Sequence, residues 1–156
     1  MRTIRTEREI AAPAGAVWEV LTDLSAYREW NPHVVDAGGR LREGETVEIR
    51  VSRGGGRARA LPVRVTEVDP PRTLSWVGRV LAAPLFEGRH TFELHELGER
   101  RTRLVNRETA TGLLVPLLVA ADAEADYEAM NDALAARVEA RVEESGNDGG
   151  RGTGAA

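Results

Sequence analysis

Residues 127–142 read YEAMNDALAARVEARV, and this stretch decides the fold. Its apolar side chains recur every three or four residues, which is the spacing of one face of an α-helix. They are Tyr127, Met130, Leu134, Val138 and Val142. Alanine, glutamate and arginine fill most other positions and favour helix. The sequence therefore predicts a long amphipathic helix near the C-terminus, with one apolar face that needs a partner.

Short runs of strand-forming residues precede this helix and are separated by glycine and proline turn signals. The expected strands cover residues 33–37, 46–52, 59–68, 73–80, 86–96 and 102–109. A further strand is expected over residues 3–11, where apolar and polar side chains partly alternate. These runs predict seven strands joined by short loops, as in an antiparallel meander.

Two short helices are expected between the first strand and the meander. Pro13 suits the first helical turn, and Val17, Val20, Leu21 and Leu24 follow at helical spacing. Residues 25–30 extend the helical segment until Asn31-Pro32, since the residue before a proline disfavours helix. The pattern is α+β, and one sheet has just one substantial helix to cover it. We therefore expect a seven-stranded curved antiparallel sheet around the long C-terminal helix.

Length and composition predict one folded domain. The chain has 156 residues and is 42% hydrophobic, enough for a core of its own. We expect residues 1–144 to form this domain. Residues 145–156 are rich in glycine and poor in apolar side chains, so we expect a disordered tail there.

The composition excludes several kinds of chemistry. The chain has no cysteine, and all 21 basic residues are arginine, so thiolate nucleophiles and lysine Schiff bases are ruled out. A net charge of −4 without a basic stripe argues against a nucleic-acid partner. We expect no cofactor and no metal site. We also expect no transmembrane segment and no secretory signal, and hence a cytoplasmic protein. The expected oligomeric state is a monomer or weak homodimer.

Several segments in order resemble the START-like (helix-grip, SRPBCC) superfamily, in particular its polyketide cyclase/dehydrase-like family. They are AVWEVLTD at 16–23, YREWNP at 27–32, VDPPRTLSW at 68–76, EGRHTF at 87–92 and YEAMNDAL at 127–134. The resemblance covers residues 3–143. It implies a helix-grip fold with an internal cavity that holds lipids, polyketides or aromatic metabolites. It does not by itself imply catalysis, because function depends on the site and not on the fold.

Strand parity places a polar cluster on the inner face of the sheet. If Phe92 faces the C-terminal helix, His90 shares its side, and Asn106 and Glu108 share the side of Leu104. A turn that pairs Leu94 with Leu104 sets Phe92 opposite Asn106 and His90 opposite Glu108. Such a pair could contact a ligand, exchange protons, or only satisfy each other's hydrogen bonds.

Other candidates for the ligand site are aromatic or adaptable side chains expected near the same face. They are Trp30, His33, Trp76, Tyr127 and Met130. Each could also be ordinary core. Asn131 shares the helix stripe and is expected either to meet a polar partner inside or to lie exposed at its edge. His95 has the opposite parity to His90, so we expect it to face solvent.

Three hypotheses for function follow. The first is a binder or carrier of a small, mainly hydrophobic ligand in an internal cavity. The second is an enzyme of the cyclase, aromatase or dehydratase kind, in which His90 and Glu108 exchange protons and Asn106 polarises a carbonyl. The third is a module that regulates a partner protein, for which an exposed apolar patch would be the sign.

Overall fold

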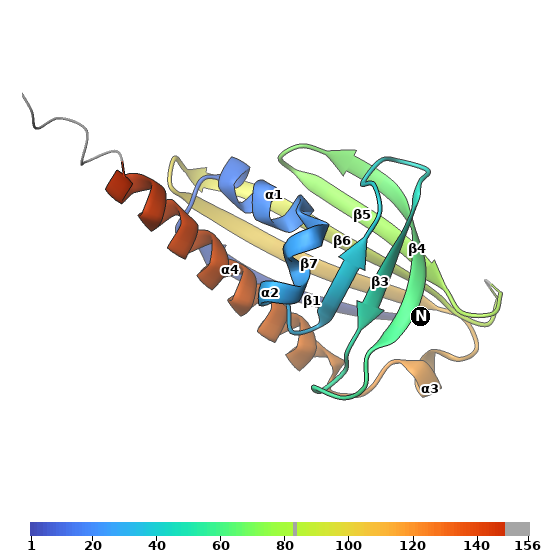
Figure 1. The fold of residues 1–156 in the computed structure, drawn as a ribbon. Coiled ribbons are helices and arrows are strands. Elements are labelled where there is room, and N and C mark those ends of the chain that lie inside the picture. Colours follow the sequence, from blue (N-terminus) through green and yellow to red (C-terminus); the bar gives the residue numbers. More distant parts are fainter. Residues whose placement is uncertain (83, 149–156) are drawn as a thin grey trace, which may run out of the picture.

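The computed structural model describes residues 1–82 and 84–148, and in it the seven strands form one antiparallel sheet in the order β1-β7-β6-β5-β4-β3-β2 (Figure 1). The strands are β1 (Arg2–Ile10), β2 (Val34–Gly38), β3 (Thr46–Val51), β4 (Arg59–Asp69), β5 (Thr73–Arg79), β6 (Glu87–Gly98) and β7 (Arg101–Thr111). The helical elements are α1 (Ala14–Thr22), the 3₁₀ turn η1 (Leu24–Ala26), α2 (Tyr27–Trp30), α3 (Val115–Leu118) and α4 (Ala123–Asp148).

The sheet curves around α4, which lies along its concave side, while α1 and α2 connect the two sheet edges, β1 and β2 (Figure 1). This arrangement confirms the predicted α+β helix-grip fold. The curvature has a simple cause: the sheet must bend for its apolar face to be covered by α4 on β1 and β7 and by η1 and α2 on the opposite edge, β2.

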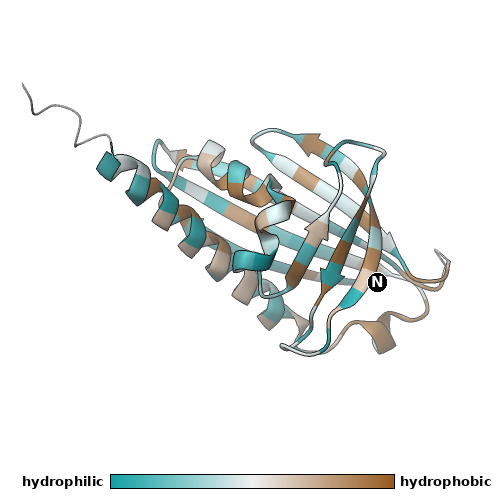
Figure 2. Ribbon diagram, viewed as in Figure 1, coloured by the Kyte–Doolittle hydropathy of each residue, from teal (hydrophilic) through white to brown (hydrophobic). Residues whose placement is uncertain are grey.

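The core fills the space between the inner face of the sheet and the apolar stripe of α4. Figure 2 shows apolar and polar residues alternating along the strands. On β1, Ile4, Thr6 and Ile10 are buried, whereas the residues between Thr6 and Ile10 are exposed. On α4 the buried residues recur at helical spacing: Tyr127, Met130, Asn131, Leu134, Ala135 and Val138. Burial of these two periodic patterns against each other fixes the position of the helix.

The register between β6 and β7 is the predicted one. Leu94 pairs with Leu104, Phe92 with Asn106, and His90 with Glu108. His90 and Asn106 are buried, at 6% and 1% exposure. The inner face of the sheet therefore carries a polar cluster at one end of an otherwise apolar core.

The boundaries differ from the sequence prediction mainly at the C-terminal helix. Strand ends agree within two residues. However, α4 continues to Asp148, so residues 145–148 of the expected tail are helical. A formed helix gains one hydrogen bond for each residue added, and the Ser145 hydroxyl also donates to the Arg141 carbonyl over 3.0 Å. Residues 149–156 of that predicted tail lie outside the described residues.

Candidate functional site

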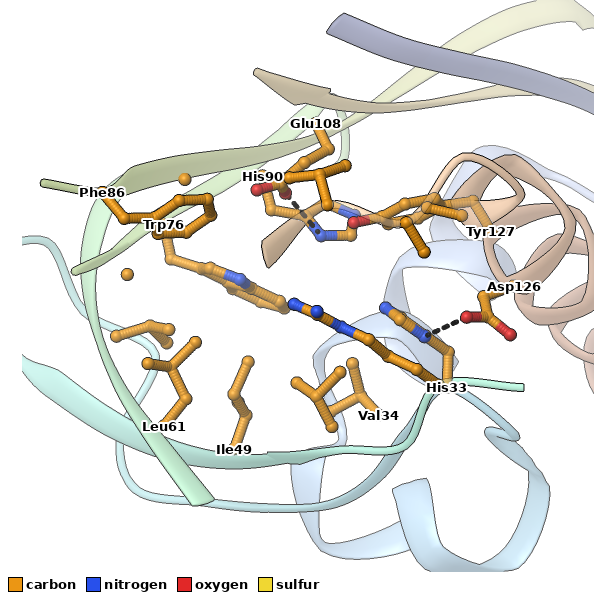
Figure 3. Close-up of a pocket in the computed structure, with 18 residues that line it drawn as sticks. His33, Val34, Ile49, Leu61, Trp76, Phe86, His90, Glu108, Asp126 and Tyr127 are labelled. Atoms are coloured by element: carbon orange, nitrogen blue, oxygen red, sulfur yellow. Dashed lines mark ion pairs between the residues drawn. The ribbon is translucent and has the colours of Figure 1, made fainter. Parts of the chain in front are cut away.

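A cavity of about 90 Å³ lies between the concave face of the sheet and the first turn of α4 (Figure 3). Its apolar walls include Val34, Ile49, Leu61, Val63, Trp76 and Phe86. Its polar lining consists of His33, Arg53, His90, Glu108, Asp126 and Tyr127. The site thus combines an apolar chamber with a small set of ionisable and hydrogen-bonding groups, as ligand sites commonly do.

Five of the nine predicted site residues line this cavity: His33, Trp76, His90, Glu108 and Tyr127. The other four lie outside its lining: Trp30, Phe92, Asn106 and Met130. Three of these four are buried one layer deeper, with exposures of 0–1%. The fourth, Trp30, is half-buried at the edge of the core and packs edge-on against Tyr27, with ring centroids 5.1 Å apart.

A chain of side-chain hydrogen bonds runs from the cavity into the core. The Asn131 amide donates to the Thr6 hydroxyl over 2.8 Å, and the Asn106 amide donates to the Asn131 carbonyl oxygen over 2.8 Å. The remaining oxygen, Asn106 Oδ1, lies 2.6 Å from His90 Nε2. Asn131 therefore meets polar partners inside, which is the first of the two positions expected for it.

This chain sets the tautomer of His90. An amide oxygen can only accept, so His90 Nε2 must carry the hydrogen that it donates to Asn106. In the neutral ring, Nδ1 is then an acceptor, and it lies 3.4 Å from Glu108 Oε2. An ionised Glu108 would set its oxygen lone pairs against the lone pair of that nitrogen, whereas a protonated Glu108 avoids this repulsion. The geometry favours a neutral histidine beside a protonated carboxylic acid.

Burial favours the same neutral state. It raises the pKa of Glu108 to about 7, with the positive charge of Arg53 opposing the shift. Burial is also the main cause that lowers the pKa of His90 to about 3; His33 adds to that effect and the hydrogen bond to Asn106 opposes it. Near neutral pH the cavity therefore holds an uncharged imidazole and a carboxyl group poised between its two protonation states.

Replacing Glu108 with glutamine is expected to make stability less dependent on pH. The folded pKa of Glu108 lies above its ordinary value of 4.5, so the folded state binds more protons than the unfolded state between these values. This group's contribution to stability therefore falls as pH rises from 4.5 through 7. Between pH 5 and pH 8 the free energy of unfolding of the wild-type protein should fall by about 2–3 kcal/mol relative to that of Glu108→Gln.

Urea denaturation of both proteins at pH 5 and pH 8 measures this difference. Both proteins retain His90, so its own titration largely cancels in the comparison. Parallel pH dependences for the two proteins would show that Glu108 titrates as an ordinary exposed carboxylate.

The chain segment before β2 positions His33 at the cavity. Asn31 Oδ1 accepts hydrogen bonds from the backbone N–H groups of His33 and Val34, over 3.0 and 2.8 Å. This local turn is typical of asparagine and fixes the start of β2. His33 Nδ1 donates to the Ser52 carbonyl over 3.0 Å, and its ring packs on Tyr127 with centroids 4.9 Å apart.

Arg53 and Asp126 close one side of the cavity, and the sequence reasoning did not select either for the site. The Asp126 carboxylate accepts from the Gly54 backbone N–H over 3.0 Å and lies 3.9 Å from His33 Nδ1. The Arg53 guanidinium donates to the Leu118 carbonyl. The β3–β4 loop is thereby tied to the segment that leads into α4. The available signals were a charged residue beside three glycines and an acid just before Tyr127.

Two glycines paired across β5 and β6 leave room for the polar end of the cavity. Gly78 pairs with Gly88, and both line the cavity. A Cβ atom added to Gly88 would lie 2.4 Å from Glu108 Oε1. The Glu108 carboxyl group occupies its position because residue 88 has no side chain.

Substitution Gly88→Ala should weaken ligand binding and leave the fold intact. The added methyl group meets the far end of a flexible side chain, so Glu108 can swing away from His90 at little cost to stability. We expect affinity for an apolar probe to fall about tenfold, the usual scale for one misplaced methyl group in a pocket. Gly98→Ala is the matched control, because nothing lies within 4 Å of a Cβ atom there. Equal affinities of the two variants in a fluorescence titration would contradict this role of Gly88.

Two hydrogen-bond donors at the cavity, the Tyr127 hydroxyl and Trp76 Nε1, have no partner among the described residues. Tyr127 is 8% exposed and Trp76 is 2% exposed, yet neither the Tyr127 hydroxyl nor Trp76 Nε1 makes a hydrogen bond within residues 1–82 and 84–148. Burial, with Glu108 nearby, raises the pKa of Tyr127, so its hydroxyl stays protonated. Both groups are therefore available as hydrogen-bond donors to a molecule in the cavity.

Metal sites, membrane-spanning helices and the position of His95 were also considered in the sequence. Among the described residues, no group of three or more histidine, aspartate or glutamate side chains is arranged to hold a metal ion. Within the same part of the chain, no helix is both long and apolar enough to cross a membrane. His95 lies on the outer face, with its side chain 53% exposed, as predicted.

Solved structures of other proteins show that this chain has the START-like helix-grip fold. The aromatase/cyclase ZhuI from Streptomyces sp. R1128 superposes with a TM-score of 0.66 at 22% identity, over 99% of both chains. A START superfamily protein from Mycobacterium smegmatis gives a TM-score of 0.67 at 18% identity, over 91% of this chain and 97% of the other. A Helicobacter pylori protein gives 0.73 at 16% identity, over 88% of each. At these identities the likeness establishes the fold alone.

The family follows from the sequence match. Residues 1–139 match the family described as polyketide cyclase/dehydrase and lipid transport, and the chain belongs to that family. This confirms the resemblance inferred from the short segments. No protein with curated annotation matches the chain.

Proposed function

We propose that the protein binds or carries a small, mainly hydrophobic molecule that bears a hydrogen-bonding oxygen. The observation that carries the proposal is the cavity itself, with apolar walls, a protonatable Glu108 and the unpartnered Tyr127 hydroxyl at one end. Apolar walls supply affinity, while a few placed polar groups fix orientation. An acceptor oxygen on the ligand would satisfy the donors that the protein leaves unpaired.

Titration with the neutral fluorescent probe N-phenyl-1-naphthylamine tests this proposal. The fluorescence of the probe should rise when it binds the wild-type protein. The His90→Ala variant should bind the probe more weakly. His95→Ala is the matched control, because His95 is on the same strand but its side chain is 53% exposed on the other face. No fluorescence gain, or equal affinities for both histidine variants, would count against the cavity as the ligand site.

An enzyme of the cyclase, aromatase or dehydratase kind is the second candidate, favoured by the contact between His90 and Glu108. A carboxyl group with a pKa of about 7 suits a general acid at neutral pH. The sequence predicts that Asn106 polarises a substrate carbonyl, but Asn106 is 1% exposed and lies outside the cavity lining. Its role in this candidate is instead to orient His90. A bell-shaped pH–rate profile lost in both His90→Ala and Glu108→Gln would support catalysis, and unchanged turnover would end it.

The third hypothesis, a module that regulates a partner protein, has one feature in its favour. Leu81, Leu113 and Leu117 are 83%, 79% and 78% exposed. The loop of Leu81 and the segment of Leu113 meet through the Leu113 N–H, which donates to the Pro84 carbonyl over 3.2 Å. This hypothesis stays a prediction, as do the cytoplasmic location, the oligomeric state and the absence of a nucleic-acid partner.

A further inference from the structure

An open groove of about 560 Å³ lies beside the cavity, between the β3–β4 loop and α3. Apolar side chains, including Leu117 and Leu118, form one part of its lining. The other part carries three arginines, Arg53, Arg57 and Arg59. The groove is thus apolar and cationic at once, unlike the neutral end of the cavity.

The groove and the cavity share walls. Val51, Arg53, Leu61 and Phe86 line both spaces. The cavity, at about 90 Å³, is smaller than the void of about 150 Å³ that holds benzene in an engineered protein. The groove, at about 560 Å³, falls in the range of about 300–1,000 Å³ typical of ligand pockets. A metabolite that places one end in the cavity is too large to fit there whole, and the groove beside the shared Arg53 offers room for the rest of it.

The groove and the cavity differ in charge, and this difference favours one orientation of a bound ligand. Among the residues that the structure describes, no carboxylate lines the groove, although the chain as a whole has a net charge of −4. Arg57 and Arg59 form no ion pair with any described residue. The inner end instead carries Glu108, which would repel an anion whenever it ionised. An anionic group is therefore favoured at the mouth, and an uncharged group is favoured inside.

We propose that the ligand is a monoanionic amphiphile whose carboxylate lies at Arg57 and Arg59 while its uncharged, oxygen-bearing end enters the cavity beside Glu108. This inference rests on the proposed function and adds a ligand class to it. Guanidinium groups match the planar geometry of a carboxylate, and the apolar side chains between the two ends cover the ligand's hydrocarbon body.

Calorimetric titration with two matched ten-carbon compounds tests the proposal: 10-hydroxydecanoate, which carries a carboxylate and a hydroxyl group, and 1,10-decanediol, which is uncharged at both ends. We expect the hydroxy acid to bind about tenfold more tightly than the diol, the scale of one charge-assisted contact. This preference should disappear in the double variant Arg57→Gln/Arg59→Gln. It should persist in Arg40→Gln/Arg42→Gln, which removes the same charge from a loop outside the groove.

The possible outcomes separate this proposal from the one on which it rests. Equal binding of acid and diol, or a preference that survives Arg57→Gln/Arg59→Gln, would overturn the anionic subsite and leave cavity binding standing. Binding of neither compound, together with no fluorescence gain from N-phenyl-1-naphthylamine, would overturn both. A preference lost only in the groove variant supports the proposed ligand class.

Discussion

Truncation of Phe92 to alanine is expected to destabilise the protein by about 3–5 kcal/mol. Phe92 is fully buried, with 0% exposure, and stacks on His90 with ring centroids 4.3 Å apart. It also meets the edge of Trp76 at 5.4 Å. Removing the ring forfeits its burial and leaves a void behind two cavity residues, which the curved sheet cannot easily close.

Urea denaturation monitored by circular dichroism measures this cost. Leu113→Ala is the control, because Leu113 is 79% exposed and its truncation should change stability by no more than about 0.5 kcal/mol. The Phe92 variant should also bind N-phenyl-1-naphthylamine less tightly, because His90 and Trp76 lose their support. A cost below about 1 kcal/mol would show that the layer beneath the cavity is not tightly packed.

The second large effect is expected when the buried amide chain is cut. Asn131→Leu removes the partner of both the Thr6 hydroxyl and the Asn106 amide, which are 5% and 1% exposed. A buried polar group without a partner costs about 1–3 kcal/mol, so the single substitution should cost about 2–4 kcal/mol. Asn106→Leu should cost a similar amount, because it leaves the Asn131 carbonyl oxygen and the Nε2 hydrogen of His90 without hydrogen-bond partners.

A double-mutant cycle decides whether the chain acts as a unit. Asn106→Leu/Asn131→Leu removes both amides together, so its cost should be smaller than the two single costs combined, by about 1–2 kcal/mol. The ¹⁵N chemical shifts of the His90 ring provide a second readout, since they distinguish the Nε2–H tautomer from its alternative. Strict additivity, with an unchanged tautomer in each variant, would show that the two amides do not act together on His90.

Strand pairing could be predicted from the sequence because it depends on local and repetitive features. Alternation along residues 90–94 and 104–108 fixed which side chains share a face, and a short turn fixed the register that sets His90 opposite Glu108. The same parity correctly placed His95 outside. These inferences needed only the period of a strand and one turn.

The depth of each side chain could not be predicted in the same way. Phe92 and His90 share a face, but Phe92 lies nearer the middle of β6 and outside the cavity lining, whereas His90 lines the cavity. Parity gives the side of a sheet and not the distance to a void. Asn106 was expected at the cavity for the same reason and lies behind His90 instead.

Arg53 and Asp126 show a second limit. Their place at the cavity depends on contacts between a loop and a helix start that are 72 residues apart, through Gly54 and Asp126. Such contacts follow from tertiary packing and have no periodic signature. The glycine at 88 was visible in the sequence, but its meaning required the position of Glu108.

The central claim is that the cavity bounded by Trp76, His90, Glu108 and Tyr127 holds a ligand. The most direct test is a crystal structure of the protein grown with N-phenyl-1-naphthylamine. We expect probe density in the groove, with only its inner end reaching past Arg53 toward Trp76 and Tyr127. Density confined to the exposed leucines Leu81, Leu113 and Leu117, with the cavity unoccupied and unchanged, would contradict the claim.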